Sequence, residues 1–281
     1  MTTPAIHSYR ELAPAQPLRP FIECYWRATS QSGPGFRPTE LLVPDLRVEV
    51  IFNPGAPWRW NDQPSSVMTC IGMRGRALAI QQPGRLNHFA VRFRPGGLAA
   101  FSGIPLAELT GRCWDMRDIW PNASELAEQL YEADSDAERV QLMDACLMRM
   151  MLRCGDDLQR AVCAARELSQ SHGCLPIAEL CERYGLHYKR LERLFARHIG
   201  LSPKHVARVA RMQHVLDLST ARPRLALAEL AAVGGYSDQA HFTRDFRALI
   251  GNTPREFFAE RFAVFETMAR SGSLDLKPVA V

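Results

Sequence analysis

IAELCERYGLHYKRLERLFARHIGLSP (residues 177–203) and LAELAAVGGYSDQAHFTRDFRALIGNTP (residues 227–254) are two copies of one pattern. The offset is 50 residues at Ile177/Leu227 and 51 at Pro203/Pro254, because the second copy carries one extra residue. Self-similarity at fixed spacing indicates a duplicated supersecondary unit. The remaining matches are Ala178/Ala228, Glu179/Glu229, Leu180/Leu230, Gly185/Gly235, Arg193/Arg244, Phe195/Phe246 and Gly200/Gly251.

Each copy has the order of elements of a helix-turn-helix unit. A short apolar-periodic segment precedes Gly185 or Gly235, where a glycine permits the left-handed backbone of a tight turn. A second segment follows and ends at Gly200 or Gly251, as helices commonly do. The pattern therefore predicts two helix-turn-helix units.

The start of the second helix differs between the copies. Ser237 stands where the turn meets the helix, so we expect its hydroxyl to cap the free N–H groups. His187 occupies this place in the first copy and is a poorer cap.

One side of each second helix is predicted to face inward and the other outward. Arg193 and Arg244 each lie two residues from apolar neighbours on both sides, about 200° around a helix, and should point outward. The predicted inward side chains are Leu191, Leu194, Phe195 and Ile199 in the first helix, and Phe242, Phe246, Leu249 and Ile250 in the second.

The segment between the copies reads as one helix over residues 203–218, with Lys204, Arg208 and Arg211 among its apolar residues. Its length of about 24 Å, extended by the flanking turns, approaches the ~34 Å of one DNA turn. Both second helices could thus enter one face of a duplex.

These residues resemble the AraC/XylS family of bacterial transcription regulators, from Ala161 to Phe258. GYSDQAHFTRDFRALIGNTPREF (residues 235–257) is similar to the most recognisable segment of that family, and LERLFARHIGLSPKHVARVARMQHVLDL (residues 191–218) to its first unit and joining helix. Cys181 and His187 depart from the family's usual alanine and serine.

The resemblance implies sequence-specific binding of double-stranded DNA by two recognition helices, and contact with RNA polymerase if the protein activates. The side chains placed at base edges are Lys189, Glu192, Arg193, Asp238, Gln239, His241 and Arg244. The phosphate contacts fall to Arg197, Lys204, Thr243 and Arg247.

The N-terminal part is predicted to be β-rich and barrel-like. In one predicted strand, Val48, Val50 and Phe52 occupy every second position. In another, Phe89, Val91 and Phe93 do so, and the opposite face, which carries Arg92 and Arg94, should be solvated or paired. LLVPDLRVEVIFNPG and FAVRFRPGGLAAFSGIPLAEL resemble a β-rich domain that precedes this DNA-binding module in regulators without an assigned effector. By analogy this part senses a small molecule or mediates self-association, including a homodimer. Some side chains could line a pocket, but aromatic residues in a β-rich domain more often belong to the core, so no ligand site is assigned to them. These candidates are Trp26, Glu49, Trp58, Trp60, His88 and Arg92.

Helices should follow the strands. Asn122 and Glu125 have the spacing of a helix cap, and Ser135 with Glu138 that of a capping box. We favour core packing over a dimer seam for the stripe Val140, Met143, Leu147, Met150 and Cys154.

The expected fold is α+β: a β-rich N-terminal domain, helices, then an all-α domain with two helix-turn-helix units on a long joining helix. The expected parts are a sensor domain (1–121), a helical segment for packing or dimerisation (122–168), a linker (169–176), the DNA-binding domain (177–262) and a tail (263–281). We expect residues from about 173 onward to fold alone.

Composition fits this interpretation. The net charge is +4, and residues 173–258 hold 13 Lys or Arg against 8 acids, whereas residues 1–155 hold 16 of each. The 8 cysteines lack metal-like spacing and read as reduced thiols, and neither a signal peptide nor a membrane span is evident, so the cytoplasm is expected.

The sequence disfavours two other functions. No hydrolase, nucleotide-binding or zinc-enzyme motif is present, so we expect no enzyme and no cofactor or metal; DNA repair on Cys70 or Cys113 would need a zinc-activated thiolate. An interaction module without DNA binding is disfavoured by Arg193, Gln239 and Arg244.

Overall fold

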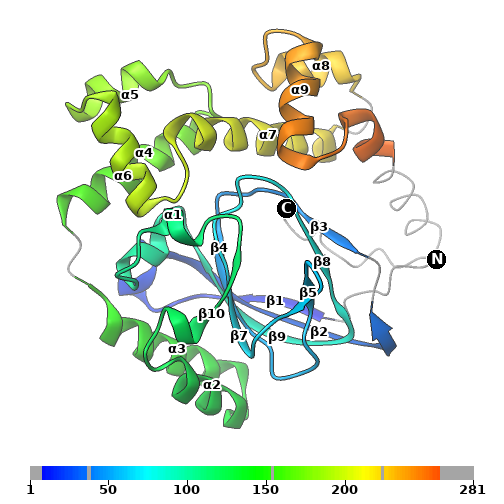
Figure 1. Cartoon of the computed structure of the whole chain (residues 1–281), viewed down its shortest axis with the longest axis vertical. Coiled ribbons are helices and arrows are strands. Elements are labelled where there is room, and N and C mark those ends of the chain that lie inside the picture. The colour runs from blue at the N-terminus through cyan, green and yellow to red at the C-terminus, as the bar shows by residue number, and fades with distance from the viewer. Residues whose placement is uncertain (1–7, 37–38, 153–154, 223–224, 260–281) are drawn as a thin grey trace.

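The structure is a computed structural model that describes residues 8–36, 39–152, 155–222 and 225–259. A β-rich N-terminal part is followed by helices, and the C-terminal part is all helical (Figure 1), which confirms the predicted α+β class. Within these ranges the strands form a six-stranded and a four-stranded sheet that do not close into a barrel.

Both sheets are antiparallel wherever a strand pairing is defined. The larger sheet has the order β1 (Ser8–Leu12), β2 (Ile22–Phe36), β9 (Pro83–Phe93), β4 (Val48–Phe52), β7 (Met68–Ile71) and β10 (Cys113–Asp115). The smaller sheet has the order β3 (Glu40–Leu42), β8 (Leu78–Gln81), β5 (Arg59–Trp60) and β6 (Gln63–Pro64).

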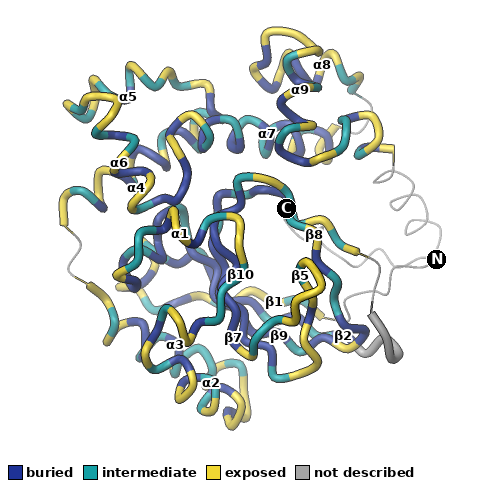
Figure 2. Tube along the Cα trace, viewed as in Figure 1, coloured by how far each residue is buried: buried dark blue, intermediate teal, exposed yellow. Residues whose placement is uncertain are grey.

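The central strands of the larger sheet are covered on both faces. Val48, Val50 and Phe52 of β4 belong to the main core, while Ile51 faces a second core against the smaller sheet. All of β4 is therefore buried (Figure 2), although its sequence alternates.

Arg92 of β9 is a buried charged side chain on the face of the larger sheet that the smaller sheet covers. Its Nε donates to Glu49 Oε1 at 2.9 Å and its Nη1 to Glu11 at 3.1 Å. Burial lowers the pKa of Arg92, but Glu49, Tyr9 and Cys24 together outweigh burial and raise the pKa overall. The expectation that this face is solvated or paired is confirmed as paired.

Helices α2 (Ala123–Glu132) and α3 (Asp136–Met150) pack against one another after the short helix α1 (Leu106–Leu109). The predicted capping box is confirmed in part: Ser135 Oγ accepts the Glu138 N–H, but Glu138 accepts the N–H of Asp134, one residue before the N-cap. Asn122 stands at the N-cap of α2, but its side chain contacts Cys146 Sγ at 3.2 Å and does not cap the helix. The cap predicted from its spacing with Glu125 is therefore wrong.

The stripe along α3 lies mostly in the core. Met143 and Leu147 are buried and Val140 and Met150 pack against the same cluster, whereas Cys154 falls outside the described residues. The fully buried members have no surface left to offer a second copy.

The C-terminal helices are α4 (Asp156–Gln170), α5 (Ile177–Tyr184), α6 (Tyr188–His198), α7 (Pro203–Ala221), α8 (Leu227–Val233) and α9 (Gln239–Ile250). Residues 254–259 are also helical. Helix α7 crosses between a group formed by α4, α5 and α6 and a group formed by α8 and α9 (Figure 1).

Helix α4 packs on α6 and α7 in this arrangement. Its buried face is Leu158, Ala161, Ala164, Ala165 and Leu168. Glu167 also accepts hydrogen bonds from Arg183 at 2.9 Å and from the Tyr184 hydroxyl at 2.7 Å, which tie α4 to α5. The helix is thus part of the C-terminal helical unit in space, although it precedes the linker expected from the sequence.

The two parts of the chain are in direct contact. The loop after β7 meets α7 and α9, since His205 Nε2 lies 2.7 Å from Gly75 O and the Ala77 N–H donates to Leu249 O at 2.7 Å. Thr110 Oγ1 donates to Gly200 O at 2.8 Å, next to α1. These bonds border one continuous apolar core.

Candidate nucleic-acid interface

Helices α6 and α9 have the predicted inward and outward faces. Every side chain predicted to face inward is buried, and Arg193 and Arg244 are exposed. The placement of apolar residues at helical spacing therefore located both faces correctly.

The turns before these helices use the expected backbone. Gly185 has φ of 60° and Gly235 φ of 76°, both in the left-handed region that disfavours side chains. Gly200 and Gly251 end the units with φ of 93° and 99°. Glycines at matched positions of the repeat thus have similar φ angles.

The cap of α9 is one residue later than predicted. Asp238 is the N-cap: its Oδ1 accepts the His241 N–H at 2.6 Å, which lowers the pKa of this carboxyl. Ser237 is not the cap, because its hydroxyl contacts Asp238 Oδ2 and His241 Nδ1. A carboxylate also suits the positive end of a helix better than a hydroxyl does. His187 stands at the N-cap of α6 without a side-chain cap, in line with the weaker start predicted there.

The proposed base-reading side chains lie along the early turns of the two helices. Lys189, Arg193, Gln239 and Arg244 are exposed, and His241 is half-buried against the Tyr236 ring. Glu192 is half-buried and accepts a hydrogen bond from the Tyr188 hydroxyl, which raises the pKa of Tyr188. Both oxygens of Asp238 already serve the helix start, so of this set it has the least freedom to meet a base.

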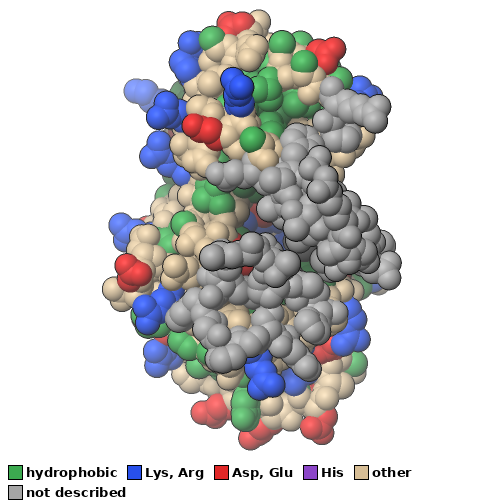
Figure 3. All heavy atoms as spheres, turned by 90° about the vertical axis from the view of Figure 1, so that its right-hand side faces the viewer, with side chains coloured by type: hydrophobic (Ala, Val, Ile, Leu, Met, Phe, Trp, Pro, Cys, Tyr) green, Lys and Arg blue, Asp and Glu red, His purple; other side chains and the backbone are tan. Residues whose placement is uncertain are grey.

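Three of the proposed phosphate contacts, Arg197, Lys204 and Arg247, are exposed. Thr243 is half-buried and its hydroxyl donates to Gln239 O at 2.8 Å within its own helix. Figure 3 shows Lys and Arg side chains projecting along one edge of the upper, helical part. This distribution suits a polyanion.

An ion pair that sequence reasoning missed fixes α9 on α7. Arg208 Nε donates to Asp245 Oδ1 at 2.6 Å, and the Tyr236 hydroxyl donates to Asp245 Oδ2 at 3.3 Å. Arg211 lies over the Tyr236 ring at 5.3 Å and donates to Gly173 O at 2.8 Å. Arg208 and Arg211 of the joining helix thus hold the second unit in place.

The thiols considered for repair chemistry are in unsuitable surroundings. Cys70 is fully buried in β7, and burial raises its pKa. Burial also raises the pKa of Cys113 in the neighbouring β10 to about 12. Both stay protonated at neutral pH, and the thiolate is the reactive form. Among the described residues, no group of three or more metal-ligating side chains occurs and no helix is long and apolar enough to span a membrane.

Each part of the chain matches a known domain family. Residues 180–260 match the family described as a helix-turn-helix domain. The C-terminal part is an AraC-type helix-turn-helix domain. Residues 10–115 match a domain of unknown function, DUF6597, which precedes the AraC-type domain here.

Several bacterial proteins are similar in sequence to a part of this chain. An uncharacterized HTH-type transcriptional regulator of Staphylococcus aureus is 31% identical over 112 residues, which are 40% of this chain and 15% of the relative. Invasion protein InvF of Salmonella typhi is 34% identical over 89 residues, 32% of this chain and 41% of InvF. The similarity thus spans less than half of either relative.

Among solved structures, ToxT from Vibrio cholerae is similar over 83% of this chain and 97% of ToxT, with 9% identity and a TM-score of 0.46. ToxT with a bound unsaturated fatty acid gives 11% identity and a TM-score of 0.40, over 92% of this chain and 97% of ToxT.

Proposed function

We propose that this protein is a sequence-specific DNA-binding transcription regulator that reads two adjacent major-groove segments with α6 and α9. The proposal rests on two matched helices, α6 and α9, which α7 connects. Arg193 of α6 and Arg244 of α9 are exposed at matched positions. Arginine binds guanine and glutamine binds adenine through two hydrogen bonds each in the major groove. The proposed base readers are the seven residues named from the family resemblance, with Asp238 chiefly a cap.

The spacing of the two helices supports this proposal. Helix α7 has 19 residues and is therefore about 28 Å long. With the flanking turns this approaches the ~34 Å between successive major grooves on one face of DNA. The Arg208–Asp245 pair limits how far α9 can turn relative to α7.

We propose that the DNA-binding unit begins near Gly155 and includes α4. Its apolar face packs on α6 and α7, and Arg190 of α6 pairs with Asp157 of α4 at 2.6 Å. A linker over 169–176 would then lie inside the unit, between α4 and α5.

We further propose that the N-terminal part controls DNA binding in the bacterial cytoplasm, through an effector or self-association. The direct contacts of the loop after β7 with α7 and α9 support this role. Contact with RNA polymerase belongs to the same proposal if the protein activates. We propose no enzymatic activity, since the buried thiols are poor nucleophiles.

The proposal is tested by a gel-shift titration with DNA from upstream of the protein's own gene, against a scrambled duplex of equal length. We expect preferential binding that weakens steeply as salt rises, because phosphate contacts release counterions. Equal affinity for both duplexes, or affinity independent of salt, would contradict it.

A further inference from the structure

A cavity of about 290 Å³ lies between the two sheets. Its apolar walls include Trp26, Ile51, Trp58, Ile71 and Ile80. The volume is just below the roughly 300–1,000 Å³ of pockets that hold drug-sized ligands, so a ligand here must be small. Of the pocket-lining candidates from the sequence, all but Trp60 line this cavity.

Two buried donors at the cavity wall have an atom without a partner in the described chain, and one acceptor of the wall, Gln82 Oε1, has none either. Arg74 is 4% exposed and donates from Nε to Val43 O and from Nη2 to Asp45, but its Nη1 has no partner. Trp58 is 1% exposed, and its Nε1 has none either. Leaving a buried donor unpaired is unfavourable, so two such donors lining one cavity indicate a missing acceptor.

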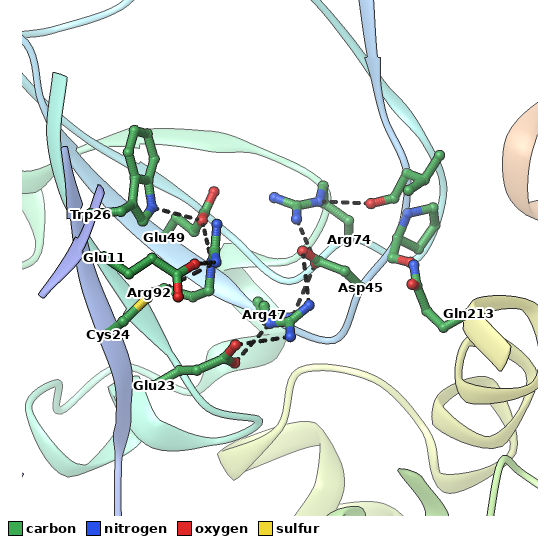
Figure 4. Close-up of polar contacts among 12 residues, drawn as sticks. Glu11, Glu23, Cys24, Trp26, Asp45, Arg47, Glu49, Arg74, Arg92 and Gln213 are labelled. Carbon is green, nitrogen blue, oxygen red and sulfur yellow. Dashed lines mark hydrogen bonds and ion pairs between the residues drawn. The ribbon is translucent and has the colours of Figure 1, made fainter. Parts of the chain in front are cut away.

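Both arginines that line the cavity are already compensated by carboxylates of its wall. Arg74 pairs with Asp45, and Arg92 pairs with Glu49, whose Oε1 also accepts the Trp26 Nε1–H at 3.0 Å (Figure 4). Burying an anion in such a site would be costly because neither arginine is left over as a counter-charge. The missing acceptor should therefore be neutral.

We propose that this cavity binds a small, flat, neutral aromatic molecule that carries a carbonyl oxygen. The oxygen accepts hydrogen bonds from Arg74 Nη1 and Trp58 Nε1, and the rings pack between Trp26 and the isoleucines. Aromatic walls favour a flat ring system through offset or edge contacts.

The cavity also adjoins the contact with the DNA-binding helices. Arg74 directly precedes Gly75, Arg76 and Ala77, and Arg76 Nε donates to Ala248 O of α9 at 2.9 Å. A ligand held by Arg74 thus lies one residue from the segment that touches α7 and α9. Its role as an effector rests on the proposed regulatory function; its binding does not.

The test uses two compounds that differ in a single carbonyl group, 1-indanone and indane. Calorimetric titration of the full chain should give saturable binding of 1-indanone about tenfold tighter than that of indane, because two hydrogen bonds are made only with the ketone. Indane-1-carboxylate, with an anionic acceptor, should bind more weakly than the ketone.

Matched tryptophan variants locate the binding. Trp58→Phe keeps a ring but removes the donor, so the affinity for 1-indanone should fall roughly threefold to tenfold while that for indane changes little. Trp114→Phe removes an equally unpartnered buried donor that does not line the cavity, and should change neither affinity.

Four results would overturn the site: no saturable binding of the ketone, equal binding of ketone and indane, tighter binding of the carboxylate, or an unchanged ketone affinity in Trp58→Phe. Gel shifts on the same preparations separate the two proposals. A protein that binds DNA but not the ketone would refute the ligand site alone. A protein that binds the ketone but not DNA would refute the DNA-binding function alone.

Discussion

Arg244 lies on the exposed side of α9, opposite the buried Phe242 and Phe246. Replacing it with alanine should leave the fold intact. The free energy of binding to the preferred site should weaken by about 1–3 kcal/mol, which is a roughly tenfold to hundredfold loss of affinity. Binding of wild type and Arg244→Ala to a panel of single-base variants of that site measures the effect.

Arg247→Ala is the matched control. It removes an exposed arginine of the same helix that is proposed to contact phosphate, so it should weaken all sequences alike. If Arg244→Ala kept the wild-type ranking of affinities across the panel, Arg244 would not read a base.

Asp245 of α9 is buried and accepts hydrogen bonds from Arg208 of α7 and from Tyr236. Asp245→Asn keeps the shape but leaves the Arg208 guanidinium without its carboxylate, and should lower the free energy of unfolding by about 1–3 kcal/mol. The value is below that of a fully buried pair because the Arg208 side chain is 32% exposed.

Chemical denaturation of the full chain measures this loss. Glu179→Gln breaks the exposed pair with Arg183 and should cost no more than about 0.5 kcal/mol. Similar losses in the two variants would mean that the Arg208–Asp245 pair does not anchor α9.

At this scale the sequence predicted side-chain faces better than partners. Arg193 and Arg244 could be placed outward because helical periodicity is local. The role of Arg208 could not be foreseen, since its partner lies 37 residues away on another helix. Serine and aspartate are both favoured at N-caps, so residue type did not reveal that the predicted cap Ser237 is replaced by Asp238.

At the scale of elements, the repeat predicted both helix-turn-helix units because each is specified by contiguous residues. The joining helix is longer than predicted, ending at Ala221, and α4 joins the C-terminal unit. The packing of α4 on α6 and α7 is tertiary, so its amphipathic pattern did not reveal which surface it covers.

We therefore revise the fragment expected to fold alone. A fragment from residue 155 onward should unfold cooperatively and bind DNA, whereas one from residue 173 onward should be much less stable because it lacks the buried face of α4. Circular dichroism during thermal melting compares the two. Equal melting temperatures would show that α4 is dispensable.

At the scale of the whole molecule, the two sheets, the cavity and the contact between the two parts all depend on residues far apart in sequence. The alternation in β4 and β9 predicted strands, but not that a second sheet covers their outer face. Long-range pairing of this kind has no signature within one strand.

The contact between the parts can be weakened at Thr110, whose hydroxyl donates to Gly200 O at the end of α6. Thr110→Val leaves this carbonyl without its donor, which should disfavour the docked arrangement by about 1–2 kcal/mol. Hydrogen exchange of the full chain should then accelerate at the facing ends of α1, α6 and α7.

Thr29→Val is the control, because Thr29 pairs with Ser8 within the larger sheet, away from the contact. Exchange that is unchanged in Thr110→Val, or equally faster in both variants, would mean that the hydroxyl does not hold the two parts together.

The central claim is that two recognition helices read two segments of one duplex. Selection of bound sequences from a random DNA library tests it directly, with the wild type, Arg193→Ala and Arg244→Ala run in parallel. The account predicts a site with two specific blocks about one helical turn, roughly 10 base pairs, apart. Arg193→Ala should relax one block and Arg244→Ala the other. A site with a single block, or the same block relaxed by both substitutions, would contradict it.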